Sequence, residues 1–301
     1  MIFGFRRTRL EASSSAKLSA RDPYRKSSEA PMLAIMRTTE LTDEQWQRLE
    51  SLLPPHKGRG RPRADDRRTL NGIVYVLRTG GRWQDVPREH GSPVTCWRRL
   101  REWEEDGTWE KIWRSLLAML DEQDRLEWDK AFLDGSFVPA KKGGAGVGKT
   151  KRGKGTKTML VTDGNGLPIG FELANANYHE VKLAVPTLQS VRVPRRTRGR
   201  PKQRPRELVA DKAYDSKRFR RWLRRRGVKP TIPPYERRPR KRARRGRPLK
   251  AGPGYRERWK VERTFAWLGN FRRLLVRQER YLSTFRAFFL VAFVLISLRK
   301  F

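Results

Sequence analysis

Apolar residues recur at helical spacing over the first third of the chain. The stretch from Leu41 to Leu53 carries them on one face, and Thr42 with Gln45 three residues later gives it the start of a capped helix. Further stripes of the same period run over 70–77, 93–103 and 109–123. The pattern therefore predicts a helical region over residues 41–125.

The pattern changes after Trp128 to short apolar runs that alternate with amphipathic stretches. The runs predict strands over 131–138, 158–161, 169–173, 207–211 and 228–232. The amphipathic stretches predict helices over 180–190, 216–226, 255–270 and 283–300. Three strands followed by alternating helix and strand are typical of an α/β domain with a mixed sheet. We assign this domain to residues 126–301.

Two segments do not fit either pattern. Residues 1–40 show no sustained period, which predicts a disordered segment or an extension ahead of the true start, since Met36 lies just before the first predicted helix. Residues 233–254 are rich in proline and basic residues, which predicts a basic insertion in the α/β domain.

The chain is strongly basic. Its 301 residues hold 70 Lys and Arg against 32 Asp and Glu, a net charge of +38. Residues 192–250 alone contain 26 basic residues and four acids, and 141–157 add a second basic stretch. Charge at this density indicates a polyanionic partner, most simply nucleic acid, and the basic residues of 192–250 suit general affinity for DNA. The alternative is a merely solvated charged surface.

Several classes of protein are disfavoured by composition. A single cysteine, Cys96, excludes a disulfide scaffold and a paired-cysteine zinc site, and three dispersed histidines argue against a histidine zinc enzyme. The longest apolar run, 287–298, is about half of a membrane span. With no secretory pattern at the start, we expect a cytoplasmic protein that does not use a membrane.

The helical region has the pattern of a helix-turn-helix DNA reader. A helix, a short connection and a second helix that carries arginines follow one another, close to a basic loop at 58–63. The candidate sequence readers are Arg98, Arg99, Arg101, Arg59, Arg61 and Arg63. A small helical bundle without DNA contacts is the alternative.

Residues 143–150 match the pattern of a phosphate-binding loop at every defined position. That motif needs a helix that starts at Lys149 and Thr150, so that its N-terminus faces the phosphates. Glycines 153 and 155 follow here, and then a predicted strand. We therefore expect no nucleotide binding, and we expect Lys149 to contact the DNA backbone from a cationic hairpin.

Three carboxylates form a candidate set through their order along the chain: first strand, fourth strand, late helix. Asp134 sits inside an apolar strand, Asp211 ends another, and Glu262 lies on a late helix. Burying lone charges is costly, and a shared divalent metal compensates for it. Oxygen ligands favour Mg²⁺ or Mn²⁺, and a pair of such ions suits phosphodiester cleavage and transfer. The alternative is that each acid forms a salt bridge with one of the many arginines.

At these residues the chain resembles bacterial insertion-sequence DDE transposases, in the group of insertion sequence five. The matching motifs are Leu41–Trp46, Gly80–Trp83, Leu133–Ser136, Val209–Tyr214 and Trp259–Leu268. The resemblance implies a ribonuclease-H-like mixed sheet flanked by helices, preceded by the helical DNA-binding domain. It also implies that Asp134, Asp211 and Glu262 form the catalytic, metal-binding triad for two Mg²⁺ or Mn²⁺ ions.

The resemblance further implies a partner and a reaction. The partner is double-stranded DNA, both the element's terminal inverted repeats and the target, and the reaction is strand cleavage followed by strand transfer, with a homodimer assembled on DNA. Tyr255 and Arg258 fit the family's last motif and would position the DNA backbone, but Gly269 stands where the family has lysine. Arg272 or Arg273, about one turn further on, is the candidate to supply that cation. The competing class is a catalytically inactive DNA-binding protein, such as a decayed transposase or a repressor.

Overall fold

The computed structural model describes residues 40–55, 62–195, 197–235 and 252–301. Most of the segment 1–40, most of the insertion at 233–254, and the loop arginines Arg59 and Arg61 lie outside the described residues. The described part, from residue 40 onward, falls within one compact unit, 39–301.

The predicted helical region is confirmed. Its helices are α2 (Asp43–Glu50), α3 (Asp66–Thr79), α4 (Pro93–Glu105) and α5 (Thr108–Glu122), with the one-turn 3-10 helices η1 (Trp83–Asp85) and η2 (Arg88–His90) between α3 and α4. The capping box forms, because Thr42 Oγ1 accepts from the Gln45 backbone N–H at 3.3 Å and Gln45 Oε1 accepts from that of Thr42 at 3.2 Å. Gly80 ends α3 in the left-handed conformation at φ 70°, which glycine adopts without strain.

The predicted mixed sheet is confirmed as well. Its strands are β1 (Lys130–Pro139), β2 (Gly148–Thr150), β3 (Gly153–Asp163), β4 (Pro168–Asn175), β5 (Glu207–Ala210) and β6 (Lys229–Thr231). They run in the order β2-β3-β1-β5-β6, with β4 also paired to β3. Strand β3 pairs antiparallel with β1, β2 and β4. Strand β5 pairs parallel with both β1 and β6.

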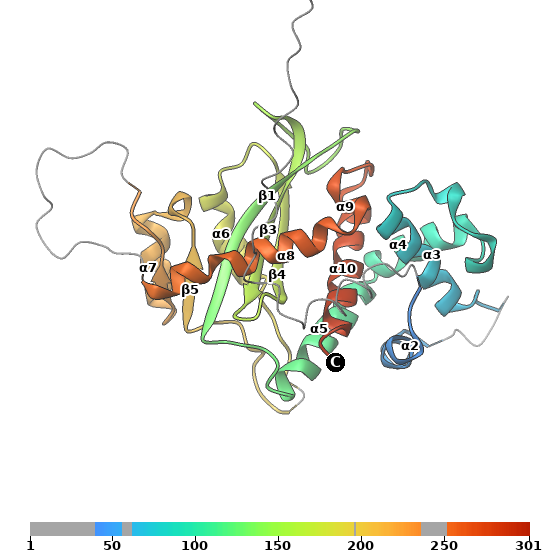
Figure 1. Ribbon diagram of the computed structural model, residues 1–301, viewed down its shortest axis with the longest axis horizontal. Helices are drawn as coiled ribbons and strands as arrows, with labels where there is room; N and C mark the ends of the chain where they lie inside the picture. The colour runs from blue at the N-terminus through green and yellow to red at the C-terminus, as the bar shows by residue number, and fades with distance from the viewer. Residues whose placement is uncertain (1–39, 56–61, 196, 236–251) are drawn as a thin grey trace, which may run out of the picture. The chain divides into compact units, whose positions relative to one another are not determined.

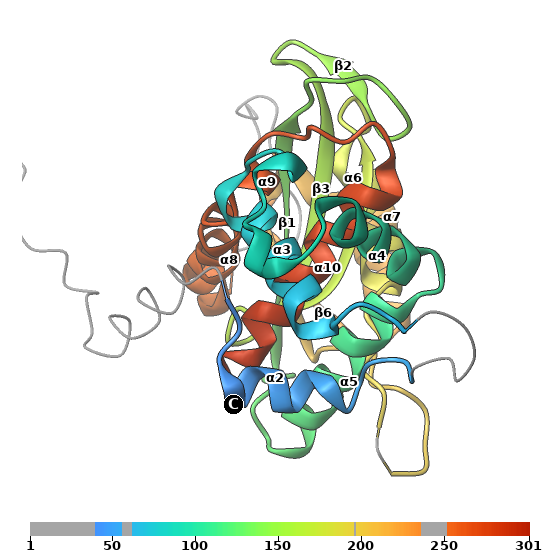
Figure 2. The ribbon, with the colours of Figure 1, turned by 90° about the vertical axis from the view of Figure 1, so that its right-hand side faces the viewer.

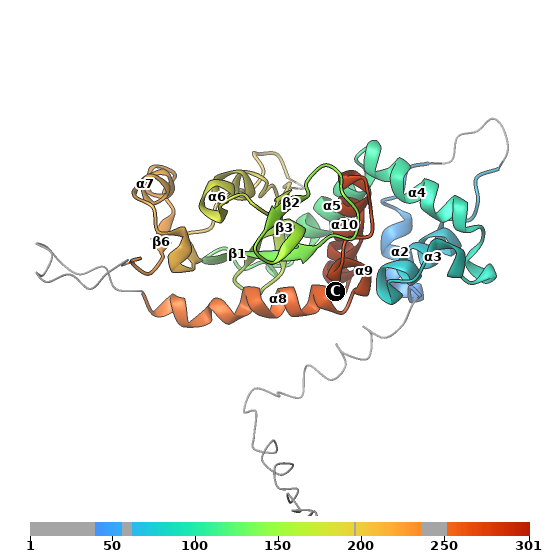
Figure 3. The ribbon, with the colours of Figure 1, turned by 90° about the horizontal axis from the view of Figure 1, so that it is seen from above.

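Helices cover both faces of this sheet (Figure 3). On one face lie α6 (Glu180–Gln189) and α7 (Lys217–Arg225), and on the other lies α8 (Trp259–Gly269). The remaining elements are η3 (Lys212–Tyr214), η4 (Pro253–Arg258), α9 (Arg272–Leu275) and α10 (Leu282–Leu298). Since α6 and α7 each follow a strand that runs in the direction of β1, both helices begin at the edge of the sheet where β5 ends.

The last helix, α10, is almost entirely apolar, and most of its residues are buried by the surrounding protein. It packs against α4 and α5 (Figures 1 and 2), and Phe293 contacts both Trp113 of α5 and Phe171 of β4, with ring centroids 5.0 and 4.9 Å apart. None of the described helices is long and apolar enough to cross a membrane. The helical region and the sheet therefore share a core at α10, and residue 125 marks a change of secondary structure within it.

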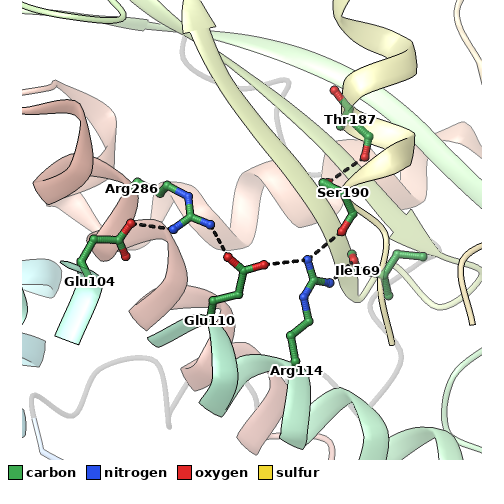
Figure 4. A network of polar contacts seen from close by, with 7 residues as sticks. All are labelled: Glu104, Glu110, Arg114, Ile169, Thr187, Ser190 and Arg286. Atoms are coloured by element: carbon green, nitrogen blue, oxygen red, sulfur yellow. Dashed lines mark hydrogen bonds and ion pairs between the residues drawn. The ribbon is translucent and has the colours of Figure 1, made fainter. Parts of the chain in front are cut away.

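A polar network ties the same elements together (Figure 4). Arg286 of α10 pairs with Glu104 of α4 at 2.6 Å and with Glu110 of α5. Arg114, nine-tenths buried, pairs with Glu110 at 3.3 Å and donates to the carbonyl oxygens of Ile169 at 2.9 Å and Ser190 at 2.7 Å. Burial lowers the pKa of Arg114 to about 10, so it is still charged at pH 7.

The single thiol should be unreactive in the native protein. Cys96 is fully buried against α3, where Gly72 leaves room for its sulfur because it has no side chain. Burial raises the pKa of the Cys96 thiol to about 11. We expect a water-soluble disulfide reagent at pH 7.5 to modify it only after denaturation. Stoichiometric labelling of the folded protein within minutes would contradict this burial.

Candidate active site

The parallel pairing of β1 with β5 sets two of the predicted acids side by side. Leu133 is opposite Ala210 in the register, and Asp134 and Asp211 are the next residues on the two chains. Neighbouring strands are about 4.8 Å apart, so the two backbones bring these acids to one level at the edge where β5 ends. Asp134 keeps 19 % of its side chain exposed.

Arg258 links the third acid to the first. Its guanidinium donates to Asp134 Oδ2 at 2.9 Å and to Glu262 Oε1 one turn further along the helix. Burial alone would lower the pKa of Arg258, but the carboxylates of Asp134 and Glu262 around it raise it above its usual value. Asp134 and Glu262 therefore face a common region on the α8 side of the sheet.

Tyr255 completes the link to the second acid. Its hydroxyl donates to Asp211 Oδ1 at 3.3 Å, while Asp211 Oδ1 also accepts from the Lys212 backbone N–H at 2.6 Å. Partial burial and the negative charge of Asp211 raise the pKa of Tyr255. The two residues that the last motif was expected to direct at DNA are thus both bonded to acids of the triad.

The donor set suits a hard cation. The three acids offer only oxygen, which is what Mg²⁺ and Mn²⁺ prefer. Burial raises the pKa of Asp134, and its bond from the Gly135 N–H and the charge of Arg258 offset this. Within the described residues, Glu40, Glu89 and His90 bring their possible metal-binding atoms within 4.8 Å of one another. The carboxylate oxygens of Asp134, Asp211 and Glu262 are spaced more widely than that. The positive charge of Arg258 bridges Asp134 and Glu262, as a bound cation would also do, so the oxygen donors fit a metal in their chemistry.

A fourth acid, Glu180 at the start of α6, lies close to the pair from the opposite face of β1. A Cβ on Gly135 would come within 3.1 Å of Glu180 Cδ, and the charge of Glu180 helps to raise the pKa of Asp134. Glu180 accepts from the Tyr214 hydroxyl at 2.9 Å and pairs with Lys157 at 3.3 Å. Sequence reasoning did not select Glu180, and its place at the start of the predicted helix 180–190, which follows a strand, was the signal that could have found it.

Glu180 should stabilise the fold through Tyr214. The Tyr214 ring is fully buried, so Glu180→Ala leaves its hydroxyl without this acceptor and should lower the free energy of unfolding by about 1–3 kcal/mol. Glu180→Gln keeps an acceptor oxygen and should cost clearly less. Urea unfolding of both variants measures the difference, and equal losses would argue against this bond.

Comparison with known proteins decides the family. The family model "Transposase DDE domain" matches residues 129–297, more than half of the chain. This chain belongs to the DDE transposase family. A second model, "Putative transposase of IS4/5 family", matches residues 41–113 of the helical region. The resemblance drawn from the motifs is therefore confirmed, and so is the ribonuclease-H-like fold that it implied.

Individual relatives agree. A protein named "Insertion element IS402 uncharacterized 16.2 kDa protein" from Burkholderia cepacia is 43 % identical over 117 residues, which are 36 % of this chain and 80 % of the relative. A "Putative transposase for insertion sequence element IS402" from the same organism is 42 % identical over 134 residues, 44 % of this chain and 58 % of the relative. Both are proteins of an insertion element.

The arginines of this transposase that were expected to contact DNA differ in exposure and in ion pairing. Arg98 is exposed on α4. Arg99 is buried and paired with Asp66, and Arg63 pairs with the same acid. Arg101 is half-buried and bonded to Glu105 at 2.8 Å, with its guanidinium over the Trp97 ring. Of the described candidates on α4, Arg98 is therefore the one with an uncommitted charge.

Two further cationic candidates lie near the sheet. Lys149 is exposed on β2, which pairs with β3 through Lys149 opposite Lys154. The transposase thus has a strand where a phosphate-binding loop requires the start of a helix, as the glycines after Thr150 indicated. Arg272 is exposed at the start of α9 and follows Gly269, where a Cβ would meet only Leu275 at 3.8 Å.

Proposed function

We propose that this transposase binds the terminal inverted repeats of its insertion sequence, cleaves DNA strands there and joins them to target DNA. Asp134, Asp211 and Glu262 are the proposed catalytic residues and ligands of two Mg²⁺ or Mn²⁺ ions. The observation that carries the proposal is the β1–β5 register, which sets Asp134 beside Asp211, together with Arg258, which links Asp134 to Glu262. The family supplies the reaction class.

The residues of the proposed site have different roles. Two bound metal ions would activate the attacking oxygen and would stabilise the negative charge on the leaving oxygen. Asp134 lies within β1 and Asp211 directly follows β5, whereas Glu262, with 53 % of its side chain exposed, sits on a helix and can adjust. Arg258 and Tyr255, both bonded to acids of the triad, would turn to the DNA phosphate when cations take over that charge.

DNA recognition is assigned to the helical region and general affinity to basic residues. Arg98 on α4 is the proposed base or backbone contact, and Arg99 would have to leave Asp66 to reach DNA. Lys149 and Arg272 lie on exposed positions that suit phosphate contacts. Joining two ends favours a homodimer on DNA, and we place the protein in the cytoplasm, where that DNA is.

A strand-cleavage assay tests this function. Labelled duplexes that carry the inverted repeat flanking the gene, or a scrambled sequence of equal length, are incubated with protein and Mg²⁺. We expect nicking at the repeat boundary and little on the scrambled duplex. Absence of nicking with either Mg²⁺ or Mn²⁺ would contradict the proposed activity.

The second candidate function is DNA binding without cleavage. Gly269 favours it, because the family's lysine is replaced by a residue with no side chain on the helix that carries Glu262. The same assay separates the two candidates when binding is followed in parallel by gel shift. Tight binding to the repeat without nicking would establish the inactive protein.

A further inference from the structure

A groove runs between α6 and α7, on the face of the sheet opposite α8. It has a volume of about 570 Å³ and is open to solvent. Its wall is apolar and partly aromatic, formed by Val181, Val185, Phe219 and Trp222. Lys182 and Arg218 are exposed at its rim. Neither the triad nor the helical region uses this groove.

The two charged residues that line the groove, Lys182 and Arg218, are both basic, and the acids Glu180 and Asp215 lie just outside its lining. Residues 217–226 contain seven basic residues and no acid, and only Arg220 among them is turned inward, to Asp215 at 2.7 Å. None of the groove's lining residues in the described part of the chain is acidic. Lys182 and Arg218 form no ion pair with any described carboxylate. This surface therefore suits a polyanion.

The groove begins at the catalytic edge of the sheet. Val181 directly follows Glu180, which accepts from Tyr214 three residues after Asp211. At the other wall, α7 starts at its N-cap Ser216, just after the same tyrosine. Both helices thus begin at the edge that holds Asp134 and Asp211.

We propose that the α6–α7 groove binds an unpaired segment of the DNA strand next to the scissile phosphate. A duplex keeps its bases paired and stacked inside, whereas an unpaired strand offers base faces to an apolar wall and phosphates to a cationic rim. The volume is in the range that holds a small ligand, so a few nucleotides fit. This inference rests on the proposed function, because it presumes DNA at the triad.

A binding experiment in EDTA tests the groove without any cleavage. Fluorescence anisotropy compares a blunt repeat duplex with the same duplex that carries a short unpaired tail. We expect the wild-type protein to prefer the tailed DNA by about tenfold. Trp222→Ala, and separately the pair Lys182→Gln with Arg218→Gln, should remove this preference, and the second variant serves if the first does not fold.

The matched control is the pair Arg224→Gln with Arg225→Gln, two exposed cations of α7 that do not line the groove. It should weaken binding of both DNAs equally and leave the preference intact. A preference unchanged in the groove variants, or absent in the wild type, overturns the proposal. So does a groove variant that changes only self-association in sedimentation, which would assign the groove to a second copy of the chain.

The outcome is independent of the proposed function's own test. If the protein binds tailed DNA through the groove but never nicks, the cleavage proposal fails and the groove stands. If it nicks the repeat normally while groove variants keep the tail preference, only the groove assignment fails.

Discussion

Asp134→Asn is expected to lower the rate of metal-dependent strand cleavage by about a thousandfold or more. Asparagine keeps the shape of the side chain and an oxygen for Arg258, but it removes the negative charge that would hold a cation beside Asp211. Single-turnover cleavage of an end-labelled repeat duplex measures the effect. DNA affinity in EDTA should change little, since the loss concerns chemistry.

Asp129→Asn is the matched control for this prediction. Asp129 lies just before β1, has 62 % of its side chain exposed and forms a surface pair with Arg206 at 2.8 Å. Surface pairs contribute little, so this variant should cleave within about twofold of the wild type. Near-normal cleavage by Asp134→Asn, or an equal loss in Asp129→Asn, would remove Asp134 from the proposed triad.

The largest effect on stability is expected from Arg114→Ala. The variant removes a buried cation and leaves the carbonyl oxygens of Ile169 and Ser190 without that donor (Figure 4). Breaking a buried pair of this kind costs about 3–5 kcal/mol, and we expect the lower end because Glu110 keeps 39 % of its side chain exposed and retains Arg286. Calorimetry should show a melting temperature lower by about 10 °C.

Lys111→Ala on the same helix is the control. Lys111 is exposed on α5 and donates to the Asp106 carbonyl oxygen at a long 3.4 Å, so its loss should move the melting temperature by about a degree at most. Equal melting temperatures for wild type and Arg114→Ala would show that this network does not hold the helical region to the sheet.

Local patterns predicted the elements of this fold well, because each depends on neighbouring residues. The apolar run around Leu133 is β1, and the run over 169–173 lies in β4. At the turn from β3 to β4 the Asp163 carboxylate accepts from the backbone N–H groups of Asn165 and Leu167. The strand β2 was not predicted. It has three residues and exists only through its pairing with β3.

The motifs grouped Asp134, Asp211 and Glu262, but local patterns did not predict the other side-chain partners that are distant in the sequence. The position of Arg99 on a basic helix predicted a DNA contact. In the fold its charge is instead neutralised by Asp66, 33 positions earlier in the sequence. Glu180 comes close to Asp134 only because β4 returns the chain to the same edge of the sheet. The charge of a residue and its position along the chain do not specify such pairs, because each pair depends on how the whole domain folds.

The central claim is that Asp134, Asp211 and Glu262 share divalent cations. Its most direct test is a crystal of the protein grown with Mn²⁺ and measured for anomalous scattering at the manganese edge. We predict two peaks among these three carboxylates, about 3.5–4 Å apart, with Arg258 turned away from Asp134. Manganese bound only at Glu40, Glu89 and His90, or no peak at the triad, would contradict the account.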